Sequence, residues 1–516
     1  MPATKTSLSH PIRVDWLPTP WPGKVGLTFA PGKRDPYSPN GPWDRDLAAD
    51  LARLRNAYEV THLVTLMEDH ELELLHNSAL RAEAANAGLQ PHRLPIVDVS
   101  VPQDRAAVLR LVLDITAWAQ QGNNVVIHCR GGLGRSGTIG GCVLRAAGFD
   151  GESALAALAE ARAPNCPETT EQRNYVRSFG FPTLAPQVSG TVLRAAGGLL
   201  PRVAGAVLGA AIGDALGHPT EFFSYPALEA KYGPGGAKQY ELWWERDGKR
   251  FAPYTDDTQM AEIVLRALLQ HGTAPAAFEA TMETIGKGFA LWSHKPQGGH
   301  RAPGTTCMAG AAQLLRGVPW REAGVRDGGG CGSVMRAYPF GLVLGHDIAR
   351  AEHWAVEHSR MTHQAPMALA ACAAMAVGMA AEMSAVSPSS ALAAMVEAAG
   401  RYDTATAKLA ETALKDASNQ ANPIEVLTEL QGWNAQEAIA AAMFVVARHP
   451  GDIRAALLEG ANASGDSDSI ATLAGALLGA RHGIAALPED WVRDVERSDE
   501  LLELALEASV VAAMQD

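Results

Sequence analysis

The spacing of hydrophobic residues changes character near residue 180. Before that point, short apolar runs alternate with stretches in which apolar residues recur every three or four positions. The apolar runs predict β-strands at residues 24–29, 61–67, 93–98 and 124–129. The helical spacing predicts helices at residues 102–121, 135–147, 152–163 and 169–179. This alternation predicts an α/β domain built on a mostly parallel sheet.

After the stretch GFPTLAPQ at residues 180–187, alanine and glycine become more frequent and strand signals nearly vanish. Long segments of helical period then continue to the end of the chain. The length of 516 residues exceeds what one ordinary hydrophobic core accommodates. We therefore predict two domains, an α/β domain at residues 1–185 and an all-α domain at residues 198–516, with the boundary inside residues 181–200.

The composition narrows the classes of partner and compartment. Apolar residues make up 47% of the chain and charged residues 19%, as in globular proteins. The formal net charge of −13 disfavours nucleic acid, because phosphate backbones are held by clustered Lys and Arg. The 6 cysteines include no CxxC pair and the N-terminus lacks the apolar core of a signal peptide, so we expect a cytoplasmic protein. The run 365–381 is mostly alanine, which favours a buried helix over a membrane span.

A glycine-rich loop follows the strand predicted at residues 124–129. It lies within VVIHCRGGLGRSGT, so that Cys129 ends the strand and Arg135 begins a helix. Glycines allow successive backbone N–H groups to turn inward, and the helix N-terminus adds partial positive charge. Cysteines in such cradles react as thiolates, and an arginine there can grip phosphate oxygens. The amides predicted to hold the anion are those of Gly131, Gly132 and Gly134.

The order of these residues resembles a known family. Cys-x5-Arg, preceded by His128 and followed by Ser136, is similar to the signature of the cysteine-dependent tyrosine and dual-specificity phosphatases. The resemblance implies that Cys129 attacks phosphorus while Arg135 clamps the phosphate. It implies that Ser136 helps to break the phosphocysteine and that His128 orients the loop. It implies no cofactor in the N-terminal domain.

Two further residues extend this resemblance. The sequence PIVD at residues 95–98 resembles the acid loop of the small phosphatases of the cyclin-dependent kinase inhibitor type, which implies that Asp98 protonates the leaving oxygen. A solvated loop carboxylate is the alternative interpretation of Asp98. Those relatives carry a glutamine on a late helix, and Gln172 matches it, with the implied role of positioning the water that hydrolyses the phosphocysteine.

Acidic residues open two predicted helices of the C-terminal domain. Aspartates and hydroxyl residues stand at the start of two segments, YTDDTQMAEIVL (254–265) and SGDSDSIATLAGALLGA (464–480). Glu221 lies near the end of a third segment, GAVLGAAIGDALGHPTEF (205–222). One such helix start is ordinary capping. Two brought together require cations to neutralise them, and oxygen ligands without a nearby His/Cys set select Mg²⁺, Mn²⁺ or Ca²⁺ over Zn²⁺.

At these motifs, from about residue 202 to 483, the chain resembles the ADP-ribosylglycohydrolase family, which includes enzymes that reactivate ADP-ribosylated dinitrogenase reductase. Further matching blocks are GCGSVMRAYP (330–339) and SRMTH (359–363). The resemblance implies an all-α fold, two Mg²⁺ or Mn²⁺ ions, and cleavage of the bond between ADP-ribose and its acceptor. The implied metal ligands are Thr255, Asp256, Asp257, Asp466, Asp468 and Ser469.

The resemblance also assigns residues around the metal pair. Glu221 would lie beside it as a ligand or as an acid/base, and His363 would contact substrate, with a core histidine as the alternative. Cys331 departs from the family, which usually carries Asn there, and Ser469 replaces the more common Thr. The loop residues implied in substrate binding are Gly330, Gly332 and Ser333. A stripe of glycines four positions apart predicts close helix packing rather than ligand contact, at Gly205, Gly209, Gly213 and Gly217.

These resemblances lead to one main hypothesis and two alternatives. The main hypothesis is a bifunctional hydrolase, in which the N-terminal domain hydrolyses phosphomonoesters and the C-terminal domain hydrolyses an ADP-ribosyl N- or O-glycosidic bond. Its partners would be an ADP-ribosylated protein or small molecule and a phosphorylated protein or small-molecule phosphoester. In the first alternative, one domain is catalytically silent and binds phosphate or ADP-ribose for the other. In the second, the phosphatase acts on a non-protein substrate such as a phosphorylated ribose.

Overall fold

The computed structural model describes residues 4–38, 41–179, 189–246, 248–296 and 298–514. The chain divides into two compact units, Met1–Gly198 and Leu199–Asp516. Part of the predicted boundary segment, residues 181–188, lies outside the described residues. The helix α8 (Gly190–Gly217) begins in the first unit and continues into the second.

The first unit is built on a five-stranded sheet of order β1-β2-β7-β5-β6. Strands β2, β7, β5 and β6 are parallel, and β1 pairs antiparallel with β2 at one edge. The strands are β1 (Asp15–Trp16), β2 (Val25–Phe29), β5 (Val60–Thr65), β6 (Gln90–Arg93) and β7 (Asn124–Cys129). A separate short ribbon pairs β3 (Arg34–Asp35) with β4 (Trp43–Asp44). Because β7 is the middle strand, its last residue, Cys129, lies at the centre of the carboxyl edge.

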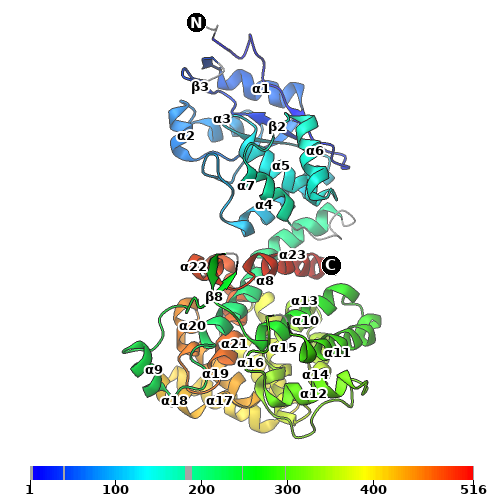
Figure 1. Ribbon diagram of the computed structural model, residues 1–516, viewed down its shortest axis with the longest axis vertical. Helices are drawn as coiled ribbons and strands as arrows, with labels where there is room; N and C mark the ends of the chain where they lie inside the picture. Colours follow the sequence, from blue (N-terminus) through cyan, green and yellow to red (C-terminus); the bar gives the residue numbers. More distant parts are fainter. Residues whose placement is uncertain (1–3, 39–40, 180–188, 247, 297, 515–516) are drawn as a thin grey trace. The chain divides into compact units, whose positions relative to one another are not determined.

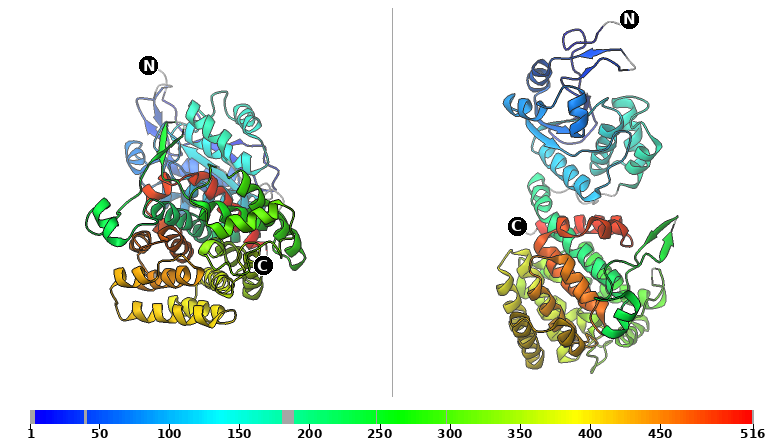
Figure 2. Two further views of the ribbon diagram at one scale, coloured as in Figure 1. Left: turned by 60° about the horizontal axis from the view of Figure 1, so that its bottom comes forward. Right: turned by 90° about the vertical axis from the view of Figure 1, so that its left-hand side faces the viewer.

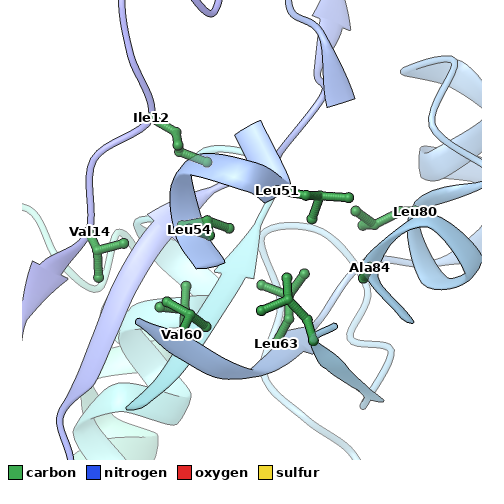
Figure 3. Packing of buried hydrophobic residues seen from close by; sticks show 10 residues of the cluster. Ile12, Val14, Leu51, Leu54, Val60, Leu63, Leu80 and Ala84 are labelled. Atoms are coloured by element: carbon green, nitrogen blue, oxygen red, sulfur yellow. The ribbon is translucent and has the colours of Figure 1, made fainter. Parts of the chain in front are cut away.

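Helices cover this sheet and close its core. Leu51 and Leu54 of α1 pack with Val60 and Leu63 of β5 in one apolar cluster, which Leu80 of α3 completes (Figure 3). Helices α4 and α5 contact β7, and α6 and α7 pack against α5. The helices of this unit before α8 are α1 (Leu47–Ala57), α2 (Asp69–Leu74), α3 (Leu80–Asn86), α4 (Arg105–Gln120), α5 (Gly134–Ala146), α6 (Gly151–Ala161) and α7 (Thr170–Ser178). The predicted α/β class with a mostly parallel sheet is confirmed.

One predicted strand is wrong in position. Residues 93–98 were expected to form a strand, but β6 ends at Arg93. The Leu94 and Ile96 N–H groups still donate to Thr65 O and Leu66 O, each at 3.1 Å, and the intervening Pro95 has no N–H to donate. Residues 94–97 have no regular secondary structure, and Asp98 begins a turn.

The second unit is almost entirely helical, as predicted (Figures 1 and 2). The exception is the hairpin of β8 (Trp244–Arg246) and β9 (Lys249–Phe251), whose three-residue strands are too short to produce a periodic signal. After α8 the helices are α9 (Tyr225–Tyr232), α10 (Asp256–His271), η2 (Pro275–Ala277), α11 (Phe278–His294), α12 (Thr305–Leu315), η3 (Cys331–Ser333), α13 (Tyr338–Leu344), α14 (Ile348–Ser359), α15 (Pro366–Met383), α16 (Pro388–Gly400), α17 (Thr404–Ser418), α18 (Pro423–Glu429), α19 (Ala435–Arg448), α20 (Ile453–Ala461), α21 (Ser467–His482), η4 (Ile484–Ala486), α22 (Glu489–Asp494) and α23 (Ser498–Ala513).

Within the described residues, two helices are long and apolar enough to cross a membrane. They are Thr191–Gly217 and Pro366–Met383, and 72% and 83% of their apolar windows are buried inside the folded chain. The second is α15, which contacts α13, α14, α16, α19 and α21. Its alanine-rich surface is covered on several sides by other helices, as a core helix requires.

The glycine stripe of α8 packs directly on α21. A Cβ added at Gly205 or Gly209 would lie 2.2 or 2.3 Å from the carbonyl oxygens of Gly479 and Gly475. At Gly217 it would lie 2.3 Å from the Cα of Asp468. The predicted packing role of the stripe is confirmed. This close approach also places the end of α8 against the start of α21, where the aspartates lie.

Candidate active sites

The cysteine loop joins β7 to α5. Cys129 is buried, and its Sγ accepts a hydrogen bond from the Gly132 N–H at 3.2 Å and lies 3.5 Å from Ser136 Oγ. Gly132 has a φ of 74°, and a Cβ there would lie 2.4 Å from Thr28 O, so that only glycine fits. The structure thus brings together the cysteine, one predicted amide and the predicted hydroxyl.

The predicted phosphate clamp has a partner that no local motif predicts. Arg135 is buried and donates to both carboxylate oxygens of Glu71, at 2.5 and 2.8 Å. Burial alone would raise the pKa of Glu71, but the hydrogen bonds from Arg135 lower it below its usual value. This bidentate pair fixes the plane of the guanidinium. Glu71 lies 64 positions from Arg135, in MEDHEL directly after β5, and no spacing rule links the two.

Asp98 forms an ion pair with the same arginine, Arg135. Its Oδ1 is 2.8 Å from Arg135 Nη2, and half of its side chain is exposed. The neighbouring Ile96 carbonyl accepts from Arg135 Nη1 at 2.9 Å, so the acid loop is held to the clamp at two points. Val99 follows with a φ of 62°, which is unusual for a β-branched residue. A carboxylate at this place faces the cradle rather than bulk solvent alone, which favours the acid interpretation over the solvated one.

His128 and Gln172 are both buried beside the loop. His128 Nε2 lies 2.8 Å from Thr65 Oγ1, and burial lowers the pKa of His128 to about 4, so the ring is neutral at pH 7. Gln172 Nε2 donates to Ser100 O at 3.0 Å, while its Oε1 accepts from the Thr169 N–H at 3.2 Å. A Cβ added at Gly134 would lie 3.0 Å from the Gln172 amide, so Gln172 lies between the cysteine loop and the acid loop.

A second arginine holds the outer side of the loop and was also missed. Arg162 Nε donates to Gly132 O at 2.8 Å and its Nη2 to Gly131 O at 3.3 Å, while Nη1 pairs with Asp15. Because these carbonyls point toward Arg162, they do not compete with the amides that face the anion. The pairing joins residues 30 or more positions apart, which no local pattern predicts.

In the second unit, the predicted metal ligands gather where α8, α10 and α21 meet. Thr255 caps α10 by accepting from the Asp257 N–H, and Asp466 caps α21 by accepting from the Ser469 N–H. Thr255 Oγ1 also lies 3.5 Å from Asp468 Oδ2, which joins the two helix starts. All six predicted ligands are buried, namely Thr255, Asp256, Asp257, Asp466, Asp468 and Ser469.

A further aspartate, Asp214 of α8, organises the start of α10. Its carboxylate is fully buried and accepts from the Thr255 N–H at 2.8 Å, the Thr258 N–H at 3.0 Å and Thr258 Oγ1 at 2.6 Å. Asp214 lies in the stretch GAVLGAAIGDALGHPTEF, but no local spacing predicts its role. Asp214 therefore holds the Thr-Asp-Asp turn in place from behind.

The acidic residues destabilise one another unless cations are present. Burial raises the pKa of Asp256, Asp257 and Asp468 well above the usual range, and their acidic neighbours raise it further. Burial and then Asp466, Asp256 and Asp214 raise the pKa of Glu221 to about 9. Among the described residues, Asp257 Oδ2 is buried without a hydrogen-bond partner. Divalent cations such as Mg²⁺ bind to carboxylate and hydroxyl oxygens. Buried carboxylates, one of them with an oxygen that makes no hydrogen bond, together with adjacent hydroxyls therefore fit such a cation.

A histidine also reaches this centre. One ligand atom each of His218, Glu221 and Asp468 lies within 4.8 Å of the others. His218 Nδ1 has no partner among the described residues, and burial and then Arg301 lower the pKa of His218 to about 4. The sequence carries no sign of this histidine at the centre, because only the turn after α8 brings its ring to the acidic cluster. His218 lies within GHPTEF, where spacing alone predicts no partner for it.

The loop of η3 lies against the same cluster. Cys331 Sγ is 2.8 Å from Asp466 Oδ2, while Ser333 is fully buried and accepts from Ser359 Oγ at 2.9 Å. Arg336, also buried, donates to Gly332 O at 2.6 Å and so fixes the turn. His363 is 1% exposed, and its Nε2 faces the position that a Cβ on Gly330 would occupy, at 3.4 Å. Ser333 and His363 therefore support the loop from inside, which favours the core interpretation of His363.

Two exposed aromatic rings flank the acidic residues. Phe222, next to Glu221, is 66% exposed and stacks on Trp433, which is 40% exposed, with ring centroids 5.3 Å apart. The Phe222 N–H donates to Gly465 O at 3.0 Å, which ties the ring to the residue before Asp466. Exposed stacked rings beside buried charges are suited to hold a planar group of a substrate.

Comparisons with known proteins match both units. A family model described as ADP-ribosylglycohydrolase matches residues 196–516, and one described as the Swiss Army Knife protein, DSP-PTPase phosphatase domain matches residues 44–178. The ADP-ribosyl-[dinitrogen reductase] glycohydrolase of Rhodospirillum rubrum is 28% identical over 320 residues, which cover 59% of this chain and 96% of that protein. The ADP-ribosylarginine hydrolase Tri1 of Pseudomonas putida is 26% identical over 315 residues, with 60% and 78% covered. The Cyclin-dependent kinase inhibitor 3 of Homo sapiens is 31% identical over 94 residues, which cover 18% of this chain and 44% of that protein. These matches confirm the two resemblances.

Proposed function

We propose that the chain, which belongs to the ADP-ribosylglycohydrolase family and carries a dual-specificity phosphatase-type domain, is a bifunctional hydrolase. The second unit would hydrolyse the glycosidic bond between ADP-ribose and an acceptor, using Mg²⁺ or Mn²⁺. The first unit would hydrolyse phosphomonoesters through a phosphocysteine. The observation that carries the first part is the buried acidic cluster at the meeting of α8, α10 and α21. The Cys129 cradle carries the second.

In the second unit, the aspartates and hydroxyls of α10 and α21 would hold the cations. When bound there, such cations would supply Lewis acidity for the ribose hydroxyls and a water. Asp214 keeps the Thr255 turn in place through its three hydrogen bonds. Glu221, at 9% exposed, is the most exposed carboxylate of the cluster. It is therefore the group best placed to exchange a proton with a substrate.

We assign arginine as the acceptor in the second unit. A guanidinium is planar and cationic, so it stacks on aromatic faces and is attracted by neighbouring carboxylates. Phe222 and Trp433 offer the aromatic faces next to Glu221. The relative Tri1 is named an ADP-ribosylarginine hydrolase, which supports this acceptor class.

In the first unit, Cys129 Sγ would attack phosphorus while the leaving oxygen takes a proton from Asp98. Asp98 Oδ1 lies 2.8 Å from Arg135 Nη2; substrate phosphate would displace this carboxylate from the arginine, and Asp98 would take a proton from solvent before it protonates the leaving oxygen. The phosphocysteine would then be hydrolysed by a water held near Gln172, which lies between the two loops. Attack at phosphorus, with the S–P bond later broken by water, returns the thiol and releases phosphate.

Two substrates test these assignments on the full chain. With Mg²⁺, the wild type should release ADP-ribose from an ADP-ribosylarginine peptide, and a chelator or Asp256→Asn should abolish the release. The Cys129→Ser variant should lose hydrolysis of an aryl phosphate and keep the release of ADP-ribose. ADP-ribosylserine peptide is the acceptor control, and faster turnover of it would exclude arginine as the preferred acceptor.

The same assays separate catalysis from a purely binding role. A silent phosphatase unit would bind a phosphopeptide in calorimetry without turnover, and Arg135→Ala would remove that binding. A silent second unit would bind ADP-ribose and leave ADP-ribosylarginine intact with every divalent cation. Either outcome would replace the bifunctional proposal by the recruiting role for that unit.

A further inference from the structure

The thiol of Cys331 lies next to two predicted oxygen ligands of the metal, Asp466 and Ser469. We propose that Cys331 is a metal ligand, which makes the acidic centre a mixed oxygen–sulfur site for thiophilic divalent cations such as Co²⁺, Zn²⁺ or Cd²⁺. The proposal rests on the proposed function only in that both require a cation at this cluster. It goes beyond that function, since the aspartates and hydroxyls by themselves select Mg²⁺ or Mn²⁺.

The geometry places the sulfur against two predicted ligands. Cys331 Sγ is 2.8 Å from Asp466 Oδ2 and 3.7 Å from Ser469 Oγ. The residue begins η3 and is only partly buried, so an ion entering the cluster can reach it. Arg336 holds the following Gly332 carbonyl at 2.6 Å, which keeps the turn and the sulfur in place.

A second observation points to a ligand at the same place. Asp257 is 3% exposed, and its Oδ2 has no hydrogen-bond partner among the described residues. Asp257 interacts with the Ser469 side chain, the same hydroxyl that lies near Cys331 Sγ. A buried, unpaired carboxylate oxygen is costly unless something binds it. One cation held by Asp257, Asp466 and Cys331 would satisfy that oxygen.

Sulfur changes which cation the centre prefers. Thiolate ligands favour softer ions, whereas Mg²⁺ takes oxygen ligands almost exclusively. On coordination the Cys331 thiol loses its proton to solvent and the sulfur electron pair forms the bond to the ion, with no change of oxidation state. The alternative is that Cys331 only donates a hydrogen bond to Asp466, in which case the centre remains oxygen-only.

Cobalt distinguishes the two, because a Co²⁺–thiolate bond absorbs in the near ultraviolet by charge transfer. The full chain carrying Cys129→Ser, which removes the nucleophilic thiol of the first unit, would be titrated with Co²⁺ in absorbance and in calorimetry. Cys331→Ser and Cys331→Asn test the ligand. Cys372→Ser is the matched control, because Cys372 is a buried thiol of the same unit whose Sγ contacts Ser333 instead of the cluster.

We expect a charge-transfer band that saturates with binding, is lost in both Cys331 variants and persists in Cys372→Ser. The affinity for Cd²⁺ relative to Mg²⁺ should fall about tenfold or more in Cys331→Ser, because the soft donor is removed. Binding heat without a band, or a band that survives Cys331→Ser, would overturn the sulfur ligand and leave the oxygen centre intact. No binding heat at all in the folded chain would overturn both the ligand and the metal-dependent function.

Discussion

At the scale of residues, the phosphatase site depends on a buried ion pair between Arg135 and Glu71. The predicted nucleophile and clamp came from one local motif, but the carboxylate that orients the clamp comes from α2. Arg162 holds the opposite side of the loop through the carbonyls of Gly131 and Gly132. Two arginines therefore fix the cysteine loop. Arg135 faces the predicted anion position, and Arg162 binds the backbone carbonyls of the loop.

Glu71→Gln should impair the first unit in both stability and activity. The variant leaves Arg135 with Asp98 as its carboxylate partner and replaces the charged pair with Glu71 by a neutral amide, a loss of about 2 kcal/mol. A misoriented guanidinium should lower kcat/KM for an aryl phosphate about tenfold or more. Glu73→Gln, on the same helix with an exposed side chain, is the control and should behave as wild type. Unchanged kinetics in Glu71→Gln would show that the pair does not orient the clamp.

His128 should make the first unit sensitive to acid. Burial lowers the pKa of His128 in the folded state to about 4, below its ordinary value of 6.5. Above pH 6.5 the ring is neutral in both states and contributes nothing. Between pH 6.5 and 4 the unfolded state takes up the proton first, so the free energy of unfolding should fall, by up to about 3 kcal/mol.

The measurement for this pH dependence is urea unfolding of wild type and His128→Gln at several pH values. After equilibration in urea at each pH, a brief hydrogen-exchange pulse at one fixed pH would label the unfolded molecules. Peptides from β7 and α5 would then report the unfolding of the first unit separately from that of the second. The loss of stability between pH 6.5 and 4 should be smaller in the variant. Parallel curves for the two proteins would mean that another group causes the acid sensitivity.

At the scale of elements, the contact of α8 with α21 brings the acidic residues together. Gly217→Ala should weaken it, because the added Cβ would lie 2.3 Å from the Cα of Asp468. We expect a loss of about 1–3 kcal/mol in stability and weaker Mn²⁺ binding, as overpacking shifts the start of α21. Gly198→Ala on the same helix is the control, since no atom lies within 4 Å of its added Cβ. It should be neutral or slightly stabilising.

Differential scanning calorimetry and Mn²⁺ titration of both variants would check this. If Gly217→Ala binds Mn²⁺ with wild-type affinity, the close helix contact does not set the geometry of the cluster. A loss in Gly198→Ala equal to that in Gly217→Ala would instead point to a general effect on α8.

Elements and single motifs were predictable because their signals are local. Strand β7 was predicted with its observed bounds, since a β-branched run bounded by polar and glycine residues leaves little choice. The strand at residues 93–98 was misplaced, because its apolar pattern continues past Arg93, where β6 ends. Asp214, Glu71 and Arg162 gained roles only in the fold, since each contacts residues 30 or more positions away.

At the scale of the whole molecule, each candidate site is complete within one unit. The residues around Cys129 all belong to Met1–Gly198, and the acidic cluster belongs to Leu199–Asp516. The family motifs were contiguous enough to predict both units, whereas His218 and Cys331 at the acidic centre emerged only from the tertiary contacts. A centre with nitrogen and sulfur nearby differs from the oxygen-only set that the sequence predicted.

The central claim is that the acidic starts of α10 and α21 form a divalent-cation centre. Its most direct test is the number of Mn²⁺ ions bound per chain at neutral pH, measured by calorimetry and by electron paramagnetic resonance. We predict two ions for the wild type and fewer in Asp256→Asn and Asp468→Asn, each with the fold retained by circular dichroism. A folded wild type that binds no Mn²⁺, or variants that bind as many ions as the wild type, would contradict the account.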